Sequence, residues 1–204
     1  MIDCFALLNE PRRPWLDVDS LKGRFLALSS EVHPDRVHNA SEREKQAAHA
    51  RYAELNAAYN TLKDPKNRLH HLLELERGST PSGIEKVPSD TMELFAQVGQ
   101  LCRNADIFIA GRAKVTAPLL KVQMFQHGME WIEQLNGLQQ ILLSRHREIE
   151  EHLRALNIVW EGTSQPDAPA RSLSLDRLEE YYRRLSFLNR WVAQLQSRIV
   201  TLSI

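Results

Sequence analysis

Apolar residues recur at helical spacing along the chain, and the first half of the sequence holds two such stripes. In residues 18–32 and again in 41–63 the stripe positions alternate between separations of three and four, which places each set on one helix face. Asp17 is a candidate N-cap for the first helix, and Ser41 with Glu44 forms a capping box before the second. The stripes have similar width, so we predict an antiparallel helical hairpin. The stripe residues are Leu21, Phe25, Leu28 and Val32, then Ala48, Tyr52, Leu55, Tyr59 and Leu62.

The rest of the chain is also predicted to be helical. Short helices near 3–9 and 66–76 would close the core of the hairpin, and 89–109 forms a further candidate helix. Another helix is expected to start at Pro118, because a proline costs no hydrogen bond in the first turn, and to run toward Asn157. The last helix has the most regular stripe, from Leu178 to Leu202. No segment alternates like a strand for long, which predicts an all-α fold.

Glycine and proline divide this pattern into regions. Residues 78–88 combine glycine, proline and serine and are predicted to be a linker, and 161–172 is predicted to be a second loop. The expected organisation is therefore an N-terminal domain over 1–77, the linker, and a C-terminal bundle of about three helices over 89–204.

Charge and composition exclude several classes of protein. Lys and Arg together number 26, as do Asp and Glu, so the formal net charge is zero. Nucleic-acid binding and polybasic membrane anchoring both need a cationic excess, so neither is expected. No apolar run reaches the length of a membrane span, and the first residues do not resemble a secretory signal. The two cysteines form no disulfide framework, and we expect a cytoplasmic protein.

Catalytic signatures are missing from the sequence. It holds no phosphate-binding glycine loop, no nucleophile elbow and no HExxH metal motif. The histidines are not spaced as metal ligands on a helix, and we interpret them as surface or rim residues. We therefore expect no enzyme activity, no cofactor and no metal site.

One segment stands out between the two predicted hairpin helices. His33, Pro34, Asp35 and Arg36 follow the first helix directly, and they precede the capped second helix. Proline and aspartate favour a turn, and a histidine complements a helix C-terminus. These preferences explain single residues of the segment. They do not explain why the segment stands directly between an amphipathic helix and a capped helix.

This arrangement resembles the J domain of the co-chaperones of DnaK-type ATPases. The resemblance extends to residues 55–68, where Ala58-Tyr59, Leu62, Asp64-Pro65 and Arg68 are similar to the end of the third helix of that domain. The opening from Asp3 to Leu8 and the residues 64–73 are similar to the HscB family of iron–sulfur co-chaperones. Residues 90–95 and 184–189 resemble parts of the C-terminal bundle of the same family.

The resemblance implies two binding surfaces. In the family, the His-Pro-Asp loop docks on a DnaK-type chaperone ATPase (HscA-like) and promotes ATP hydrolysis. Carried over, the docking residues are His33, Pro34, Asp35 and Arg36, with Lys22 and Arg24 as a cationic edge. The bundle would hold the iron–sulfur scaffold protein (IscU-like) as its client. The apolar client residues would be Leu94, Phe95, Val98 and Phe187, and the acidic one Asp106.

The client surface departs from the family pattern. Acidic residues are expected near Gly99, Cys102 and Asp106, but only the last is acidic. Phe187 lies off the stripe of the last helix, which predicts an exposed side chain, whereas Cys102 is predicted to be buried. Simple bundle core remains the alternative for Leu94, Phe95 and Val98.

The departures leave two further functions open. The protein could keep an active J domain and hold a different client. It could also be a helical adaptor whose hairpin no longer stimulates an ATPase.

Overall fold

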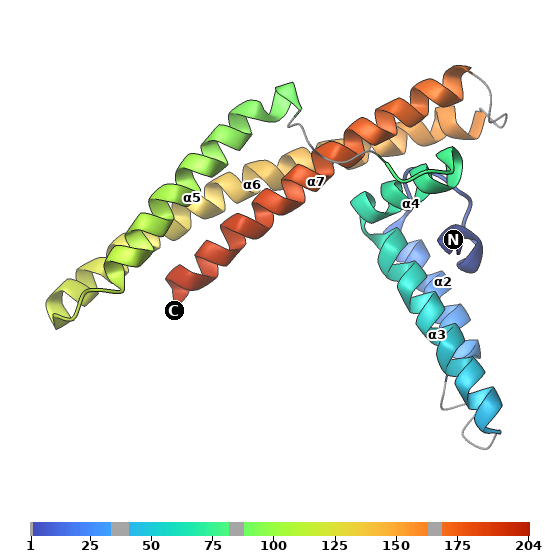
Figure 1. Ribbon diagram of the computed structural model, residues 1–204, viewed down its shortest axis with the longest axis horizontal. Coiled ribbons are helices and arrows are strands. Elements are labelled where there is room, and N and C mark those ends of the chain that lie inside the picture. The colour runs from blue at the N-terminus through green and yellow to red at the C-terminus, as the bar shows by residue number, and fades with distance from the viewer. Residues whose placement is uncertain (1, 34–40, 82–87, 163–168) are drawn as a thin grey trace. The chain divides into compact units, whose positions relative to one another are not determined.

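The computed structural model describes residues 2–33, 41–81, 88–162 and 169–204, and every regular element in these ranges is a helix (Figure 1). This confirms the all-α fold class. The elements are α1 (Cys4–Leu7), α2 (Val18–Glu31), α3 (Glu42–Lys63), α4 (Pro65–Arg77), the 3-10 turn η2 (Ser89–Thr91), α5 (Met92–Arg112), α6 (Pro118–Gly162) and α7 (Pro169–Ser203). Within the described ranges, no helix has the length and apolar character needed to span a bilayer.

Both predicted caps are present at the helix starts. The Asp17 carboxylate accepts a hydrogen bond from the Ser20 backbone N–H at 2.8 Å. The Ser41 N–H donates to the Glu44 carboxylate at 2.8 Å, and the Glu44 N–H donates back to the Ser41 hydroxyl. These contacts satisfy backbone donors that have no partner within the helix, which is why α2 and α3 begin at the predicted residues.

The predicted loop at 161–172 is too long. Helix α6 continues to Gly162 and α7 begins at Pro169. Both helix ends are held in place, because Trp160 is buried and the Arg171 guanidinium lies over its indole ring, 3.1 Å from the centroid. This contact between the helix ends stabilises turns that composition alone assigned to a loop.

The chain divides into two compact units. The first unit comprises residues 1–82 and 150–182, and the second comprises 83–149 and 183–204. Helices α6 and α7 therefore contribute to both units. The division into a domain over 1–77, a linker and a bundle over 89–204 stays a prediction.

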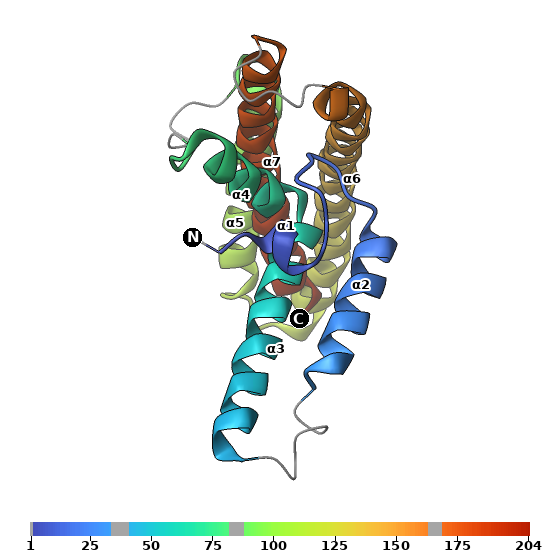
Figure 2. The same ribbon diagram turned by 90° about the vertical axis from the view of Figure 1, so that its right-hand side faces the viewer.

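The first unit is built on the predicted hairpin. Helices α2 and α3 lie side by side and run in opposite directions (Figure 2). Leu21, Leu55 and Leu62 are fully buried between them and the short helices. Further along the hairpin, Phe25 stacks on Tyr59 with ring centroids 4.6 Å apart. The tyrosines of the stripe thus contribute to packing, as their spacing indicates.

His71 is not a surface histidine, contrary to the sequence interpretation. Its side chain is buried, and its Nε2 accepts a hydrogen bond from the Cys4 backbone N–H at 3.0 Å. The ring also stacks on Phe5, 5.9 Å between centroids. The packing of α1 against this face of α4 buries the ring, and that contact joins residues too far apart for a sequence pattern to reveal.

This hydrogen bond predicts a pH-dependent stability. Burial lowers the pKa of His71, because a charged ring would lose its hydration in this position. The neutral ring is also the form whose Nε2 can accept the Cys4 N–H. The unfolded ring has an ordinary pKa of about 6.5, so below that pH the unfolded chain binds a proton first. The stability from His71 is therefore present above about pH 6.5 and is lost as the pH falls toward the lower folded value.

We expect the free-energy difference between the wild type and His71→Phe to shrink between pH 7.5 and pH 5.5. Urea denaturation of both proteins across this range measures it. A difference that does not change with pH would contradict the assignment of His71 as a neutral acceptor.

Candidate functional site

The site begins at the end of α2, where the hairpin turns. The helix ends at Glu31, and Val32 forms its C-cap. His33 follows with an exposed side chain, and its ring lies nearly perpendicular to that of Tyr52 on α3, 5.8 Å between centroids. Hairpin packing thus holds the histidine at the start of the loop. The other predicted loop residues, Pro34, Asp35 and Arg36, lie outside the described residues.

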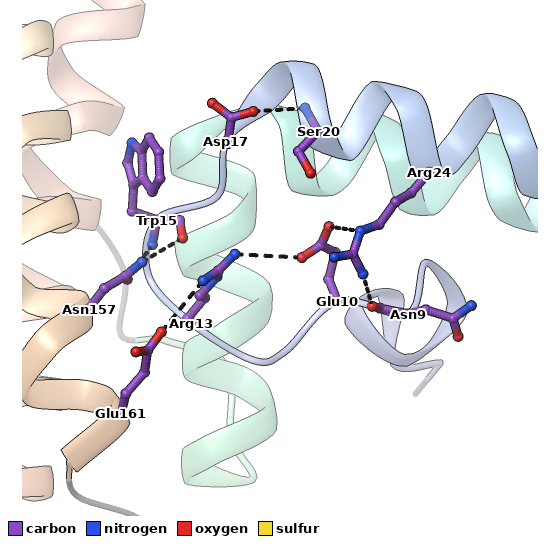
Figure 3. A network of polar contacts seen from close by, with 9 residues as sticks. All are labelled: Asn9, Glu10, Arg13, Trp15, Asp17, Ser20, Arg24, Asn157 and Glu161. Carbon is purple, nitrogen blue, oxygen red and sulfur yellow. Dashed lines mark hydrogen bonds and ion pairs between the residues drawn. The ribbon is translucent and has the colours of Figure 1, made fainter.

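The two predicted cations of α2 have different environments. Lys22 is exposed to solvent. Arg24 instead pairs with Glu10, whose carboxylate is nearly buried, at 3.0 Å between Nε and Oε1 (Figure 3). Its guanidinium also donates to the Asn9 carbonyl. Arg24 therefore holds the segment before α2 in place. Of these two cations, Lys22 is the one whose side chain is available to a partner protein.

Polar contacts tie the same segment to the end of α6 (Figure 3). The Trp15 backbone N–H donates to Asn157 Oδ1 at 3.0 Å, and Asn157 Nδ2 donates to the Trp15 carbonyl at 2.9 Å. Arg13 lies between two acids, 3.9 Å from Glu10 and 3.5 Å from Glu161. These contacts hold the start of α2, and hence the hairpin, within the first unit.

A set of ion pairs joins the end of α4 to the start of α7. The Arg171 guanidinium, stacked on Trp160, lies 2.8 Å from the Glu76 carboxylate. Arg77 pairs with Asp176 at 2.6 Å and also with Glu179. The sequence analysis missed the contacts of α4 with α7 and those of Trp15 and Arg13 with α6, because they join positions about 95 to 148 residues apart and no local motif marks them.

The predicted client residues divide into exposed and buried ones. Phe95 is 49% exposed and Leu94 is half-buried. Val98 is buried, which agrees with the alternative assignment to bundle core. Phe187 is also buried, so its predicted exposure is wrong. Its ring packs on Trp191, 5.7 Å between centroids, because α5 covers this side of α7.

The charged member of the client set is paired within the bundle. Asp106 is exposed, but its carboxylate lies 2.6 Å from the Arg198 guanidinium. The same guanidinium donates to the carbonyl of Cys102 at 3.4 Å. Cys102 is buried as predicted, and this burial raises the pKa of its thiol. The exposed client candidates are thus apolar, with one acid held by an arginine.

Comparison with known proteins identifies the first part of the chain. Residues 3–71 match the family model of the DnaJ domain. The co-chaperone protein HscB homologue of Aeromonas salmonicida is 39% identical over 92 residues, which cover 45% of this chain and 53% of that protein. The homologue of Shewanella loihica is 41% identical over 83 residues, covering 41% and 47%. The chain therefore spans about half the length of the curated relatives it matches.

Two solved structures share the fold along nearly the whole chain. The chaperone HscB from Vibrio cholerae has a TM-score of 0.56 at 21% identity and covers 96% of both chains. The human co-chaperone protein HscB has a TM-score of 0.59 at 18% identity, covering all of this chain and 83% of that one. At this identity the likeness shows the fold alone.

Proposed function

We propose that this chain, a J-domain protein of the HscB type, is a co-chaperone that stimulates the ATPase of a DnaK-type chaperone and presents a client to it. The observation that carries the proposal is the exposed His33 at the end of α2, inside the matched DnaJ domain. The chain acts here by docking on the partner and performs no covalent chemistry of its own. The partner would be an HscA-like chaperone in the cytoplasm.

The residue types of the loop and the charge of α2 suggest how docking would work. Asp35 of the loop can accept a bidentate hydrogen bond from a partner arginine, and Pro34 restricts the loop backbone. The exposed Lys22 favours approach to an acidic surface on the partner. Such a contact is small and transient, which suits a co-chaperone that must dissociate after each ATP hydrolysis.

Lys22 and Arg24 are expected to differ when each is replaced by alanine. Lys22→Ala should raise the concentration needed for half-maximal ATPase stimulation several-fold and leave stability unchanged. Arg24→Ala should lower the free energy of unfolding by about 1–2 kcal/mol, because the nearly buried Glu10 carboxylate loses the closer of its two arginine partners.

Single-turnover ATP hydrolysis by the purified DnaK-type chaperone, titrated with each variant, measures the first effect. Urea denaturation measures the second. The difference in stimulation between Lys22→Ala and the wild type should disappear at high salt, where charge attraction is screened. A destabilised Lys22→Ala, or an Arg24→Ala of wild-type stability, would contradict the two assignments.

We propose the iron–sulfur scaffold protein (IscU-like) as the client, held by the exposed part of α5. Phe95 supports this, because it presents an aromatic ring beside Trp191 of α7, 6.2 Å between centroids. Exposed aromatic side chains are typical anchors of protein interfaces. Leu94 extends this surface, whereas Val98 and Phe187 support it from the bundle core.

Phe95→Ala is expected to weaken scaffold binding by about 1–2 kcal/mol, because it removes a central aromatic contact. Calorimetric titration of the scaffold into the full chain measures the change. Ile107→Ala is the matched control, since Ile107 is exposed on the same helix. Failure of the wild type to bind the scaffold at tens of micromolar would favour a J-domain protein with a different client, as the missing acids suggest.

A further inference from the structure

The exposed Phe95 belongs to an aromatic cluster that α5 and α7 form together. Its ring lies 6.2 Å from that of Trp191, and the Trp191 ring lies 5.7 Å from that of Phe187. Phe187 and Trp191 are buried, whereas Phe95 and Met92, one turn earlier, are about half exposed. We call Phe95, Phe187 and Trp191 the aromatic cluster, and the proposed client surface is centred on it.

The helices that form the cluster carry more positive than negative charge. Residues 89–112, which comprise η2 and α5, and residues 183–203 of α7 together hold six basic and three acidic side chains. The basic ones are Arg103, Arg112, Arg183, Arg184, Arg190 and Arg198, and the acidic ones are Asp90, Glu93 and Asp106. The charge that a partner meets at the cluster depends on which of these side chains are paired.

Two of the three acids are neutralised by arginines of α7. The Asp90 carboxylate lies 3.2 Å from the Arg184 guanidinium, and that of Asp106 lies 2.6 Å from Arg198. Each pair joins α5 or the turn before it to α7. Both pairs therefore belong to the packing of the two helices and add no net charge to the surface.

Three of the remaining charges are engaged with other groups. Glu93 is two residues from Phe95, which places it on the opposite side of α5, where its carboxylate accepts a hydrogen bond from Gln97 at 3.1 Å. Arg112 donates to a backbone carbonyl at the end of α7 at 2.7 Å. Arg183 is half-buried and interacts with other residues of the chain.

Arg103 and Arg190 remain, one on each helix beside the cluster. Gly99 is one turn after Phe95, and Arg103 Nη1 lies 3.3 Å from the position that a Cβ would take on this glycine. The missing side chain lets the Arg103 guanidinium turn back along α5 toward Phe95. The guanidinium carbon of Arg190 lies 5.7 Å from the centroid of the Phe187 ring.

Both of these arginines are exposed, and in the described part of the chain neither has a carboxylate partner. The surface around Phe95 therefore has an apolar centre with a cation on each side. Such a surface is complementary to a partner that places acidic groups around an apolar contact.

We propose that the client presents carboxylates to Arg103 and Arg190 around an apolar group that contacts Phe95. The inference rests on the proposed client function of this surface and adds the charge of the partner's contact face. The absence of acids at Gly99 and Cys102 is then a change of charge preference. A nucleic acid fits less well, because two unpaired cations release few counterions and the whole chain has no net charge.

Gly99→Glu gives the sharpest test, because a glutamate four residues before Arg103 can pair with it along the helix. Calorimetric titration of the purified iron–sulfur scaffold protein into the full chain measures the change. We expect Gly99→Glu to bind several-fold more weakly than Gly99→Gln, which adds a side chain of the same size without charge. A client that requires acids at this surface would instead bind Gly99→Glu more tightly, and that result would overturn the proposal.

Charge reversal of the two arginines tests the same surface directly. Arg103→Glu and Arg190→Glu should each weaken scaffold binding about tenfold, and the loss should shrink as salt is raised. Arg147→Glu is the matched control, since Arg147 is an exposed arginine on α6, and it should bind as the wild type does. Circular dichroism checks that each variant is folded. Wild-type affinity in both reversed variants would contradict the proposal.

The inference and the client assignment can fail separately. If Phe95→Ala weakens binding while Gly99→Glu strengthens it, the client site stands and only the inference fails. If the wild type does not bind the scaffold, the client assignment fails, and two labelled helical peptides test the inference alone. Both peptides carry leucine at heptad positions a and d, and they carry either glutamate or lysine at e and g.

Fluorescence anisotropy should show that the wild type binds the glutamate peptide more tightly than the lysine peptide, and that Arg190→Glu loses this preference. Equal binding of the two peptides, or binding of neither, would overturn the inference. It would also be overturned by a labelled single-stranded oligonucleotide that binds the wild type but not Arg190→Glu, if the glutamate peptide does not bind.

Discussion

Replacing Arg68 with alanine is expected to lower the free energy of unfolding by about 3–5 kcal/mol, the size expected when a buried charged group loses two hydrogen bonds. The Arg68 side chain is 1% exposed, although it is charged. Its Nε donates to the Pro14 carbonyl at 2.8 Å and its Nη1 donates to the Leu62 carbonyl at 2.7 Å. One guanidinium therefore joins the segment before α2 to the junction of α3 and α4.

The alanine variant loses more than two hydrogen bonds. It leaves two buried carbonyls without donors, and hydrogen bonds from a charged group contribute about 1.5–3 kcal/mol each. It also creates a cavity where the side chain was packed. Burial lowers the pKa of Arg68 to about 10, so the group stays charged at neutral pH and its donors remain available.

Urea denaturation of the full chain measures this effect. Arg51→Ala is a suitable control, because Arg51 is an exposed arginine of α3 and should change stability by less than about 0.5 kcal/mol. Arg68→Lys should fall between the two, since an ammonium cannot reproduce the planar fork of donors. An Arg68→Ala variant as stable as Arg51→Ala would contradict the structural role.

Local features of the fold could be predicted from the sequence. Asp17, Ser41 and Glu44 mark helix starts, because a cap acts within one helical turn. Leu21, Leu55 and Leu62 mark the core of the hairpin, because their spacing places them on facing stripes. The place of His33 directly after the first helix could be predicted as well, whereas its role as a docking residue stays a prediction.

Long-range contacts could not be predicted in the same way. Nothing near Asn157 indicates that its amide pairs with the backbone of Trp15, and nothing near Arg24 indicates that Glu10 is its partner. The burial of Phe187 could not be predicted either. Its position beside the stripe of α7 indicated an exposed side chain, but a third helix covers that side and buries it.

His33→Gln is expected to remove the stimulation of the partner ATPase almost completely. The imidazole is exposed at the end of α2, so its loss should affect docking and leave the fold unchanged. Glutamine keeps similar size and a hydrogen-bonding group, but it lacks the aromatic ring that faces Tyr52. His49→Gln is the matched control, because His49 is an exposed histidine on α3.

The measurement that tests the central claim most directly is single-turnover ATP hydrolysis by the DnaK-type chaperone with these three proteins. The co-chaperone account predicts that the wild type and His49→Gln accelerate hydrolysis equally, and that His33→Gln leaves the rate near that of the chaperone alone. A wild type that gives no acceleration, or a His33→Gln variant that accelerates hydrolysis as the wild type does, would contradict it.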